Sequence, residues 1–152
     1  MELRSLLEEE LGLVTFVKTT GGRGLHVHIP LGAADDFDAA RDFALQVART
    51  LAGRLPDLAT TEQRRASRGR RIYLDVMRNG YAQLAVAPYS VRARPGAPVA
   101  TPLSWTELDD PALRPGQFTT ATVPGRGDPW EPMRRRRFGL GRARRAVARM
   151  AA

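Results

Sequence analysis

A chain of 152 residues with 43% hydrophobic residues is long enough for one globular domain, and the lack of cysteine excludes disulfides, thiolate metal sites and cysteine nucleophiles. No apolar run approaches the ~20 residues of a membrane span, and the acidic N-terminus is unlike a signal peptide, so we expect a cytoplasmic protein without a membrane partner. The net charge of +8 is unevenly distributed along the chain. Residues 1–132 contain sixteen basic and sixteen acidic residues, and eight arginines after residue 132 supply the excess positive charge.

The first third of the chain predicts a helix, two strands and a second helix. Leucines spaced along one face predict a helix over residues 2–11, and no capping residue precedes it, so this helix is expected to be cut short at its start. Apolar residues alternate on both sides of a glycine-rich turn, which predicts paired strands. Apolar residues that recur every three or four positions predict a helix near 36–52. Asp35 or Asp36 is expected to cap its start, and Gly53 is expected to end it.

The glycine-rich turn allows two interpretations. Gly21, Gly22 and Gly24 can adopt positive φ and leave backbone N–H groups uncovered, while Lys18 and Arg23 add positive charge, a combination suited to a phosphate. A plain hairpin loop needs no ligand and explains the glycines equally well. The spacing matches neither a Walker loop nor a dinucleotide fingerprint.

The middle of the chain predicts a buried strand that carries a carboxylate. Residues 58–65 suit a short helix or turn, and Ile72–Met77 predicts a central strand in which Asp75 meets either a metal or the neighbouring Arg78. Asn79-Gly80 predicts a hairpin turn with a returning strand over 84–88. Further on, Ser104 suits a helix cap, and residues 118–123 suit a last strand.

The basic end of the chain, residues 133–152, is expected to form a separate arginine-rich tail, disordered or helical. Such a segment binds polyanions, nucleic acid above all, without sequence preference. The arginines expected to contact nucleic acid are Arg134, Arg135, Arg136, Arg137, Arg142, Arg144 and Arg145.

Three blocks of sequence together closely resemble the polymerase domain of bacterial DNA ligase D, a member of the archaeo-eukaryotic primase superfamily. They are Lys18-Thr-Thr-Gly-Gly-Arg-Gly-Leu-His-Val27, Arg71-Ile-Tyr-Leu-Asp-Val-Met-Arg-Asn-Gly80 and Ala87-Pro-Tyr-Ser-Val-Arg-Ala-Arg-Pro-Gly-Ala-Pro98. The resemblance implies an α+β fold, the C-terminal portion of a primase-superfamily catalytic fold, with a mixed or antiparallel sheet flanked by helices. It covers a partial polymerase-like domain over 1–132.

The resemblance also implies a DNA-end nucleotidyltransferase of bacterial non-homologous end joining, with nucleoside triphosphate and DNA ends as partners and manganese or magnesium as cofactor. Asp75 matches the third of three metal-binding aspartates and would be both catalytic and metal-binding. The positions that match nucleotide-binding residues are Thr20, Gly21, Gly22, Arg23, Gly24, His26, Arg78 and Arg92.

The chain departs from the family at the other two metal ligands. The family carries an Asp-x-Asp motif ahead of the glycine loop, and no such motif precedes Thr20 here. One carboxylate is too few for two metal ions. We therefore expect a truncated homologue that is inactive alone. The alternatives are the C-terminal half of a split polymerase completed by a separately encoded N-terminal half, a non-catalytic nucleotide- and DNA-binding module, and a protein-interaction domain with a cationic tail.

Overall fold

The computed structural model describes residues 1–114 and 116–150, which form an α+β fold with two compact units. The first unit contains residues 1–13, 31–84 and 138–150, and the second contains residues 14–30, 85–114 and 116–137. The elements of the first unit are α1 (Glu2–Ser5), the π-helical turn η1 (Leu6–Glu10), α2 (Phe37–Arg54), β3 (Ala59–Thr60), α3 (Arg65–Arg68), β4 (Ile72–Tyr73), η2 (Met77–Asn79) and α4 (Gly141–Met150). Those of the second are β1 (Phe16–Thr19), β2 (Leu25–His28), β5 (Pro102–Leu103), η3 (Trp105–Asp109) and η4 (Glu131–Arg135). No helix in the described ranges has the length and apolar character needed to cross a bilayer.

Helix α2 is the longest element of the first unit, and its start follows the expected capping chemistry. The Asp36 carboxylate accepts a hydrogen bond from the Ala39 N–H at 2.7 Å, which satisfies one of the open donors of the first turn. Its apolar side is buried at Phe43, Val47, Ala48 and Leu51. The predicted end at Gly53 is wrong, because the helix continues through Arg54 and the Leu55 N–H still donates to the Leu51 carbonyl. Gly53 is exposed, so no packing contact requires the helix to end at this residue.

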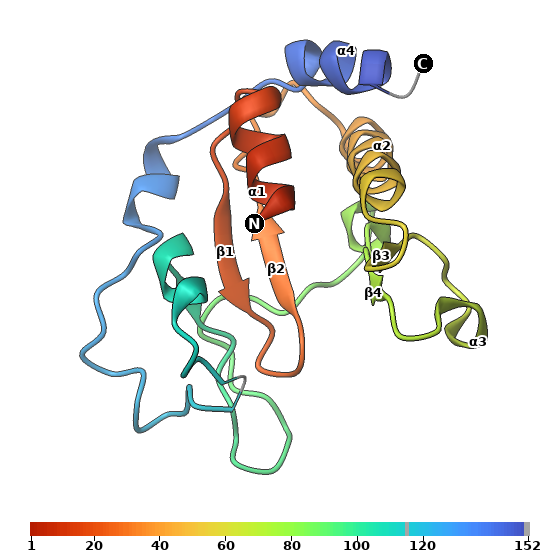
Figure 1. Cartoon of the computed structure of the whole chain (residues 1–152). Helices are drawn as coiled ribbons and strands as arrows, with labels where there is room; N and C mark the ends of the chain where they lie inside the picture. The colour runs from red at the N-terminus through yellow and green to blue at the C-terminus, as the bar shows by residue number, and fades with distance from the viewer. Residues whose placement is uncertain (115, 151–152) are drawn as a thin grey trace. The chain divides into compact units, whose positions relative to one another are not determined.

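Within the arginine-rich tail, residues 141–150 form the helix α4, which packs against the rest of the first unit. Leu140, Ala143 and Val147 are buried, and α4 contacts α2 within the first unit (Figure 1). The Leu140 N–H donates to the Asp35 carboxylate at 2.8 Å, and the Gly32 N–H donates to the Phe138 carbonyl at 2.9 Å. These contacts join the beginning of α4 to the segment that leads into α2.

The second unit is built on an antiparallel three-stranded sheet with the order β2-β1-β5. The predicted hairpin is confirmed, since β1 and β2 pair from Phe16 opposite His28 to Thr19 opposite Leu25. Strand β5 pairs with the other edge of β1. Val17, Leu103 and Phe118 form the buried cluster beneath this sheet. All four residues of β1 are buried, as expected for the middle strand.

Three predicted strands do not form as expected. Ile72–Met77 was expected to be a central strand, but β4 has two residues and pairs in parallel only with β3. Ile72 is 57% exposed, and the Asp75 carboxylate accepts the Met77 N–H, which turns the chain into η2 instead of extending it. The returning strand over 84–88 is also not formed, and Leu84 is 85% exposed. Residues 118–123 contribute one bridge, Thr119 to Pro98, before a series of turns.

Replacing Phe43 tests the core of the first unit. Because Phe43 is 3% exposed, we expect Phe43→Ala to lower the free energy of unfolding by about 3–4 kcal/mol in urea denaturation, through lost burial and a cavity. Phe37 on the same helix is 56% exposed and meets Tyr81 edge-on, so Phe37→Ala is the matched control and should cost less than about 1 kcal/mol. Equal losses in the two variants would contradict this assignment of the core.

Candidate functional site

The glycine turn between β1 and β2 is closed by the hydrogen bonds of one residue. The Thr20 N–H donates to the Gly24 carbonyl at 3.0 Å, and the Thr20 hydroxyl donates to the same carbonyl at 3.1 Å. Gly21 has φ +62°, a conformation that side chains with a Cβ rarely adopt. The hairpin is therefore a shaped loop, with Arg23 and Gly24 exposed at its tip.

Two arginines from residues 91–99 lie against this turn. The Arg92 guanidinium donates to the Thr20 carbonyl at 2.9 Å. A Cβ at Gly21 would come within 2.6 Å of Arg92 Cγ, and a Cβ at Gly22 would come within 3.1 Å of Arg94 Nη1, so glycine is needed at Gly21 for close approach as well as for its φ. Arg92 and Arg94 alternate along the chain, and of the two only Arg92 matches a nucleotide-binding position of the family resemblance. The structure brings both to the loop.

A network of buried hydrogen bonds fixes the base of the hairpin to β5 and the residues before it. The Thr19 N–H donates to the Thr101 carbonyl at 2.9 Å, and the Thr101 N–H donates to the Thr19 hydroxyl oxygen at 2.9 Å. The Thr19 hydroxyl in turn donates to the Val99 carbonyl at 3.3 Å. Every polar group in this set is paired, which is the condition for burying it without a large penalty. The network holds the loop and the Arg92 segment in fixed register.

Lys18 is the only lysine of the chain, and it is fully buried. Its ammonium donates to the Thr19 carbonyl at 3.2 Å, and within the described ranges no carboxylate lies at ion-pair distance from it. Burial and then the nearby Arg92 lower the pKa of Lys18 to about 8. The amine therefore stays largely protonated at neutral pH as an uncompensated buried charge. The sequence suggested charge beside the glycines, but not that this charge would be enclosed.

The two histidines occupy the strand that follows the turn, and they differ in surroundings. His26 is half-buried and lies opposite Lys18 in the β1–β2 register. The ring of His28 lies 4.9 Å from that of Trp130, whose indole N–H donates to the Val17 carbonyl at 2.9 Å. Burial, followed by Lys18 and His26, lowers the pKa of His28 to about 4, so His28 is neutral at physiological pH. His28 thus belongs to the packing of the sheet.

Asp75 and Arg78 lie in the first unit, around η2. Asp75 is exposed, and its carboxylate accepts the Met77 N–H at 3.1 Å. The Arg78 guanidinium donates to the Gln83 side chain at 3.3 Å rather than pairing with Asp75. Among the described residues, no three His, Cys, Asp or Glu side chains are grouped so that they could hold a metal ion. The carboxylates present here do not fit the divalent ions that the resemblance implies.

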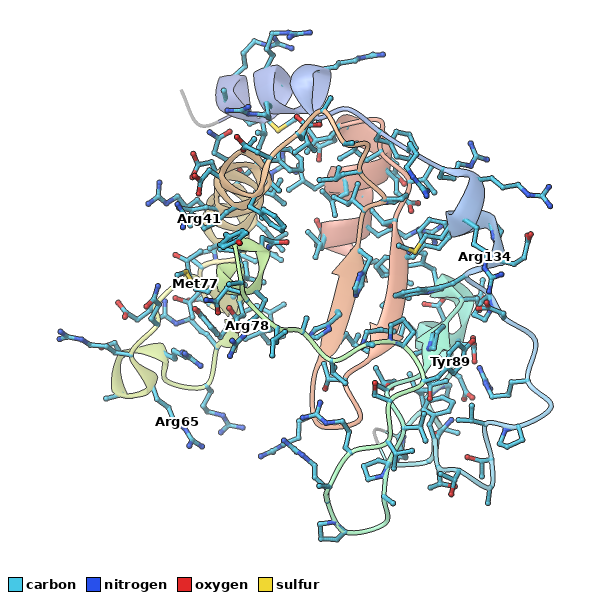
Figure 2. The ribbon with its side chains drawn as sticks, turned by 180° about the vertical axis from the view of Figure 1, so that it is seen from behind. Arg41, Arg65, Met77, Arg78, Tyr89 and Arg134 are labelled. Carbon is cyan, nitrogen blue, oxygen red and sulfur yellow. The ribbon has the colours of Figure 1, made fainter. Side chains whose placement is uncertain are left out.

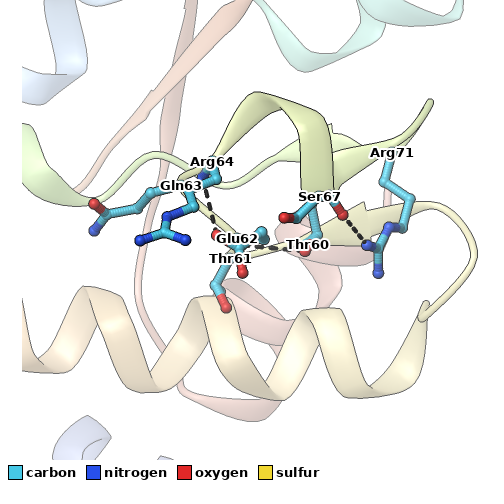
Figure 3. A pocket seen from close by; sticks show the side chains of 7 residues that line it. All are labelled: Thr60, Thr61, Glu62, Gln63, Arg64, Ser67 and Arg71. Carbon is cyan, nitrogen blue, oxygen red and sulfur yellow. Dashed lines mark hydrogen bonds between the residues drawn. The ribbon is translucent and has the colours of Figure 1, made fainter.

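A polar hollow of about 540 Å³ opens in the first unit beside α3 (Figure 3). The polar groups around this hollow form hydrogen bonds with one another. The Arg71 guanidinium donates to the Ser67 and Arg68 carbonyls, and the Glu62 carboxylate accepts the Arg64 N–H at 2.9 Å. Arg68, outside the lining, lies 3.7 Å from the centre of the Tyr73 ring and donates to the Glu62 carbonyl. The arginines between β3 and β4 therefore hold the backbone of this loop through hydrogen bonds, in addition to making the loop positively charged.

Taken together, these features define an α+β protein with a cationic glycine hairpin suited to a phosphate group. The family model of the LigD primase-polymerase domain matches residues 1–130, and the chain belongs to that family. The multifunctional non-homologous end joining protein LigD of Mycobacterium bovis is 39% identical over 112 residues, which are 74% of this chain and 15% of the relative. The corresponding LigD of Pseudomonas aeruginosa is 36% identical over 135 residues, 85% of this chain and 16% of the relative.

The fold agrees with a solved member of the family. The polymerase domain from Mycobacterium tuberculosis ligase D, in complex with DNA, superposes with a TM-score of 0.77 at 34% identity, covering 87% of this chain and 48% of that domain. The recognition made from the three sequence blocks and the predicted α+β fold are both confirmed. The chain spans about half of the solved domain and about one sixth of the curated relatives named above.

Gly21→Ala tests the close approach of Arg92 to the turn. The added methyl group would meet Arg92 Cγ at 2.6 Å in a strained backbone conformation, so we expect a loss of about 1–3 kcal/mol in thermal or urea unfolding. Gly24→Ala is the matched control, because a Cβ there has only ordinary contacts at 3.8 Å with Thr20. A Gly21→Ala variant as stable as Gly24→Ala would refute the proposed packing of Arg92 on the turn.

The buried lysine should make stability depend on pH. Since the pKa of Lys18 falls from 10.5 to about 8 on folding, the unfolded chain holds this proton between these values while the folded chain releases it, and stability rises with pH across that window. Lys18→Met should therefore stabilise the protein most below pH 8, by about 2–3 kcal/mol, and progressively less toward pH 10.5. Urea denaturation at several pH values measures the difference.

Arg23→Met is the control for this prediction, because it removes an exposed cation from the same hairpin and should leave the pH profile unchanged. The sole lysine also allows a direct measurement: the side-chain NMR signal of isotopically labelled lysine should titrate near pH 8. A midpoint near 10.5 would show that the amine is solvated and that the burial argument is wrong.

Proposed function

We propose that this chain is a nucleotide- and DNA-end-binding portion of a polymerase domain of bacterial non-homologous end joining. The observation that carries the proposal is the glycine hairpin, whose backbone is held by Arg92 and flanked by Arg94. Two guanidiniums, a glycine turn and a nearby histidine are groups of the kind that bind a triphosphate. Relatives named for end joining, and a solved relative in complex with DNA, support this choice of function.

In this proposal the triphosphate lies over the turn formed by residues 20–24. Thr20 and the glycines shape the loop, Arg23 and Arg92 supply positive charge, and His26 donates a hydrogen bond from the adjoining strand. Arg78 is a further basic contact implied by the family resemblance. We expect His26→Ala and Arg92→Gln each to weaken binding of a labelled nucleoside triphosphate about tenfold, the loss of one charge-assisted hydrogen bond.

We further propose that the chain by itself does not extend a primer. The family resemblance implies manganese or magnesium held by three aspartates, of which only Asp75 is matched. A single exposed carboxylate binds a divalent ion weakly, since several anionic ligands are needed to offset its charge and fix its geometry. Activity then requires a separately supplied segment with the Asp-x-Asp motif, as in a split polymerase with a separately encoded N-terminal half. A non-catalytic nucleotide- and DNA-binding module is the remaining alternative.

A primer-extension assay decides among these readings. The purified chain with a recessed DNA end, nucleoside triphosphate and manganese is expected to give no product, and binding of the labelled nucleotide is measured on the same sample. Extension by the chain alone that disappears in Asp75→Ala would refute the inactivity proposal. Extension that appears only when a segment containing Asp-x-Asp is added would favour the split enzyme over the non-catalytic module.

The measurement of nucleotide binding needs a control for misfolding of the variants. Thr106→Ala removes an exposed side chain of η3 in the same unit and should leave nucleotide binding unchanged. A wild-type chain that binds no nucleoside triphosphate, while its melting curve shows a cooperative fold, would refute the nucleotide site itself.

A further inference from the structure

Helix α4 lies beyond the residues that match the family model, and its side chains divide into opposite stripes. Leu140, Ala143 and Val147 form the buried stripe with α2 as its neighbour. Arg142, Arg145 and Arg149 repeat the same spacing two positions later, which places them about 200° around the helix on the opposite side. We call these three residues the arginine stripe. Figure 2 shows nitrogen-tipped side chains projecting from α4 away from α2.

The arginine stripe differs from the earlier run of arginines in how its charges are used. Within residues 1–114 and 116–150, no hydrogen-bond or ion-pair acceptor engages the guanidinium of any stripe residue, and α4 contains no acidic residue. Three of the earlier arginines are engaged with their neighbours. Arg134 lies 4.0 Å from the Asp128 carboxylate, Arg135 lies 3.4 Å from Glu131, and Arg137 donates to the Arg136 carbonyl.

We propose that the arginine stripe is a binding surface for the phosphate backbone of duplex DNA, independent of base sequence. This inference rests on the proposed function only in choosing DNA as the polyanion. The helix that carries these three exposed arginines is already formed and packed, so binding does not require the helix itself to fold. Along the helix axis they are spaced by about 4.5 and 6 Å, so the stripe extends about 10 Å, enough to reach successive phosphates of one strand.

Other partners fit the stripe less well. An interfacial membrane helix inserts an apolar face into lipid, whereas the apolar side of α4 is already buried at Ala143 and Val147. Binding to a protein needs a desolvated apolar or aromatic centre, and α4 exposes arginines around its outer side. Single-stranded nucleic acid is held largely by stacking on aromatic rings, and α4 contains none. Backbone phosphates need only charge and hydrogen-bond donors.

The test compares two triple variants with equal changes in charge. The stripe variant is Arg142→Gln, Arg145→Gln and Arg149→Gln. The control variant is Arg41→Gln, Arg54→Gln and Arg126→Gln, whose guanidiniums pair with the carboxylates of Asp38, Glu10 and Glu107. Each variant removes three positive charges from the formal net charge of +8. Binding of a blunt 20-base-pair duplex without nucleotide is measured by fluorescence anisotropy between 50 and 200 mM salt. Melting curves of both variants check that the fold persists.

We expect the stripe variant to bind at least tenfold more weakly at 50 mM salt and to lower the magnitude of the salt slope by about 2–3, because three phosphate contacts are lost. The control variant should change the slope by less than about 1. Equal effects of both variants would show that net charge alone matters and would overturn the assignment. A stripe variant that binds duplex DNA like the wild type would overturn it as well.

Two further measurements separate the alternatives. If the wild type binds phosphatidylserine vesicles through the stripe but does not bind duplex DNA, the proposal is wrong and the partner is a membrane surface. Nucleotide binding, measured on the same variants, keeps this inference distinct from the proposed function. A chain that binds DNA through the stripe but binds no nucleoside triphosphate would leave the stripe proposal standing while the proposed function fails.

Discussion

The second unit depends on a connection between residues far apart in the sequence, at the buried pair Thr19 and Thr101. Their reciprocal hydrogen bonds join β1 to the chain just before β5, and the Thr19 hydroxyl reaches the Val99 carbonyl. Arg92 extends the same connection by donating to the Thr20 carbonyl. Because these donors and acceptors are enclosed, breaking one leaves its partner unsatisfied at a cost of about 1–3 kcal/mol. The shape of the glycine turn thus depends on segments about 80 residues later.

Local patterns were sufficient for elements whose apolar spacing or capping residues can be recognised within a few neighbouring positions. The hairpin of β1 and β2 and the capped helix α2 both follow from such patterns, as does the short helix after Ser104. Periodicity failed over residues 72–88, where an apolar run suggested a central strand. The Asp75 carboxylate and the Asn79 side chain instead bond to nearby backbone groups, and this local pairing competes with strand formation. The apolar pattern alone does not show whether such local hydrogen bonds or strand pairing will win.

The site residues show a similar limit. The three family blocks predict roles for the turn, His26 and Arg92. The enclosure of Lys18 and the approach of Arg94 to Gly22 depend instead on tertiary contacts that no local pattern encodes. His28 alternates with His26 along the strand, and only its position beside Trp130 shows that it packs against an aromatic ring. Burial distinguishes the enclosed Lys18 and the packed His28 from the residues that are only expected to bind, and burial is a property of the folded chain.

The burial of the sole lysine has a consequence for how the protein's surface responds to its surroundings. Every other side-chain cation outside the two histidines is an arginine, whose guanidinium keeps its proton beyond the physiological pH range. The positive charge that the arginines present to an anionic partner therefore stays constant across the physiological pH range. Ionic strength, which screens exposed charges over about 8–10 Å, is the variable left to tune its attraction to polyanions.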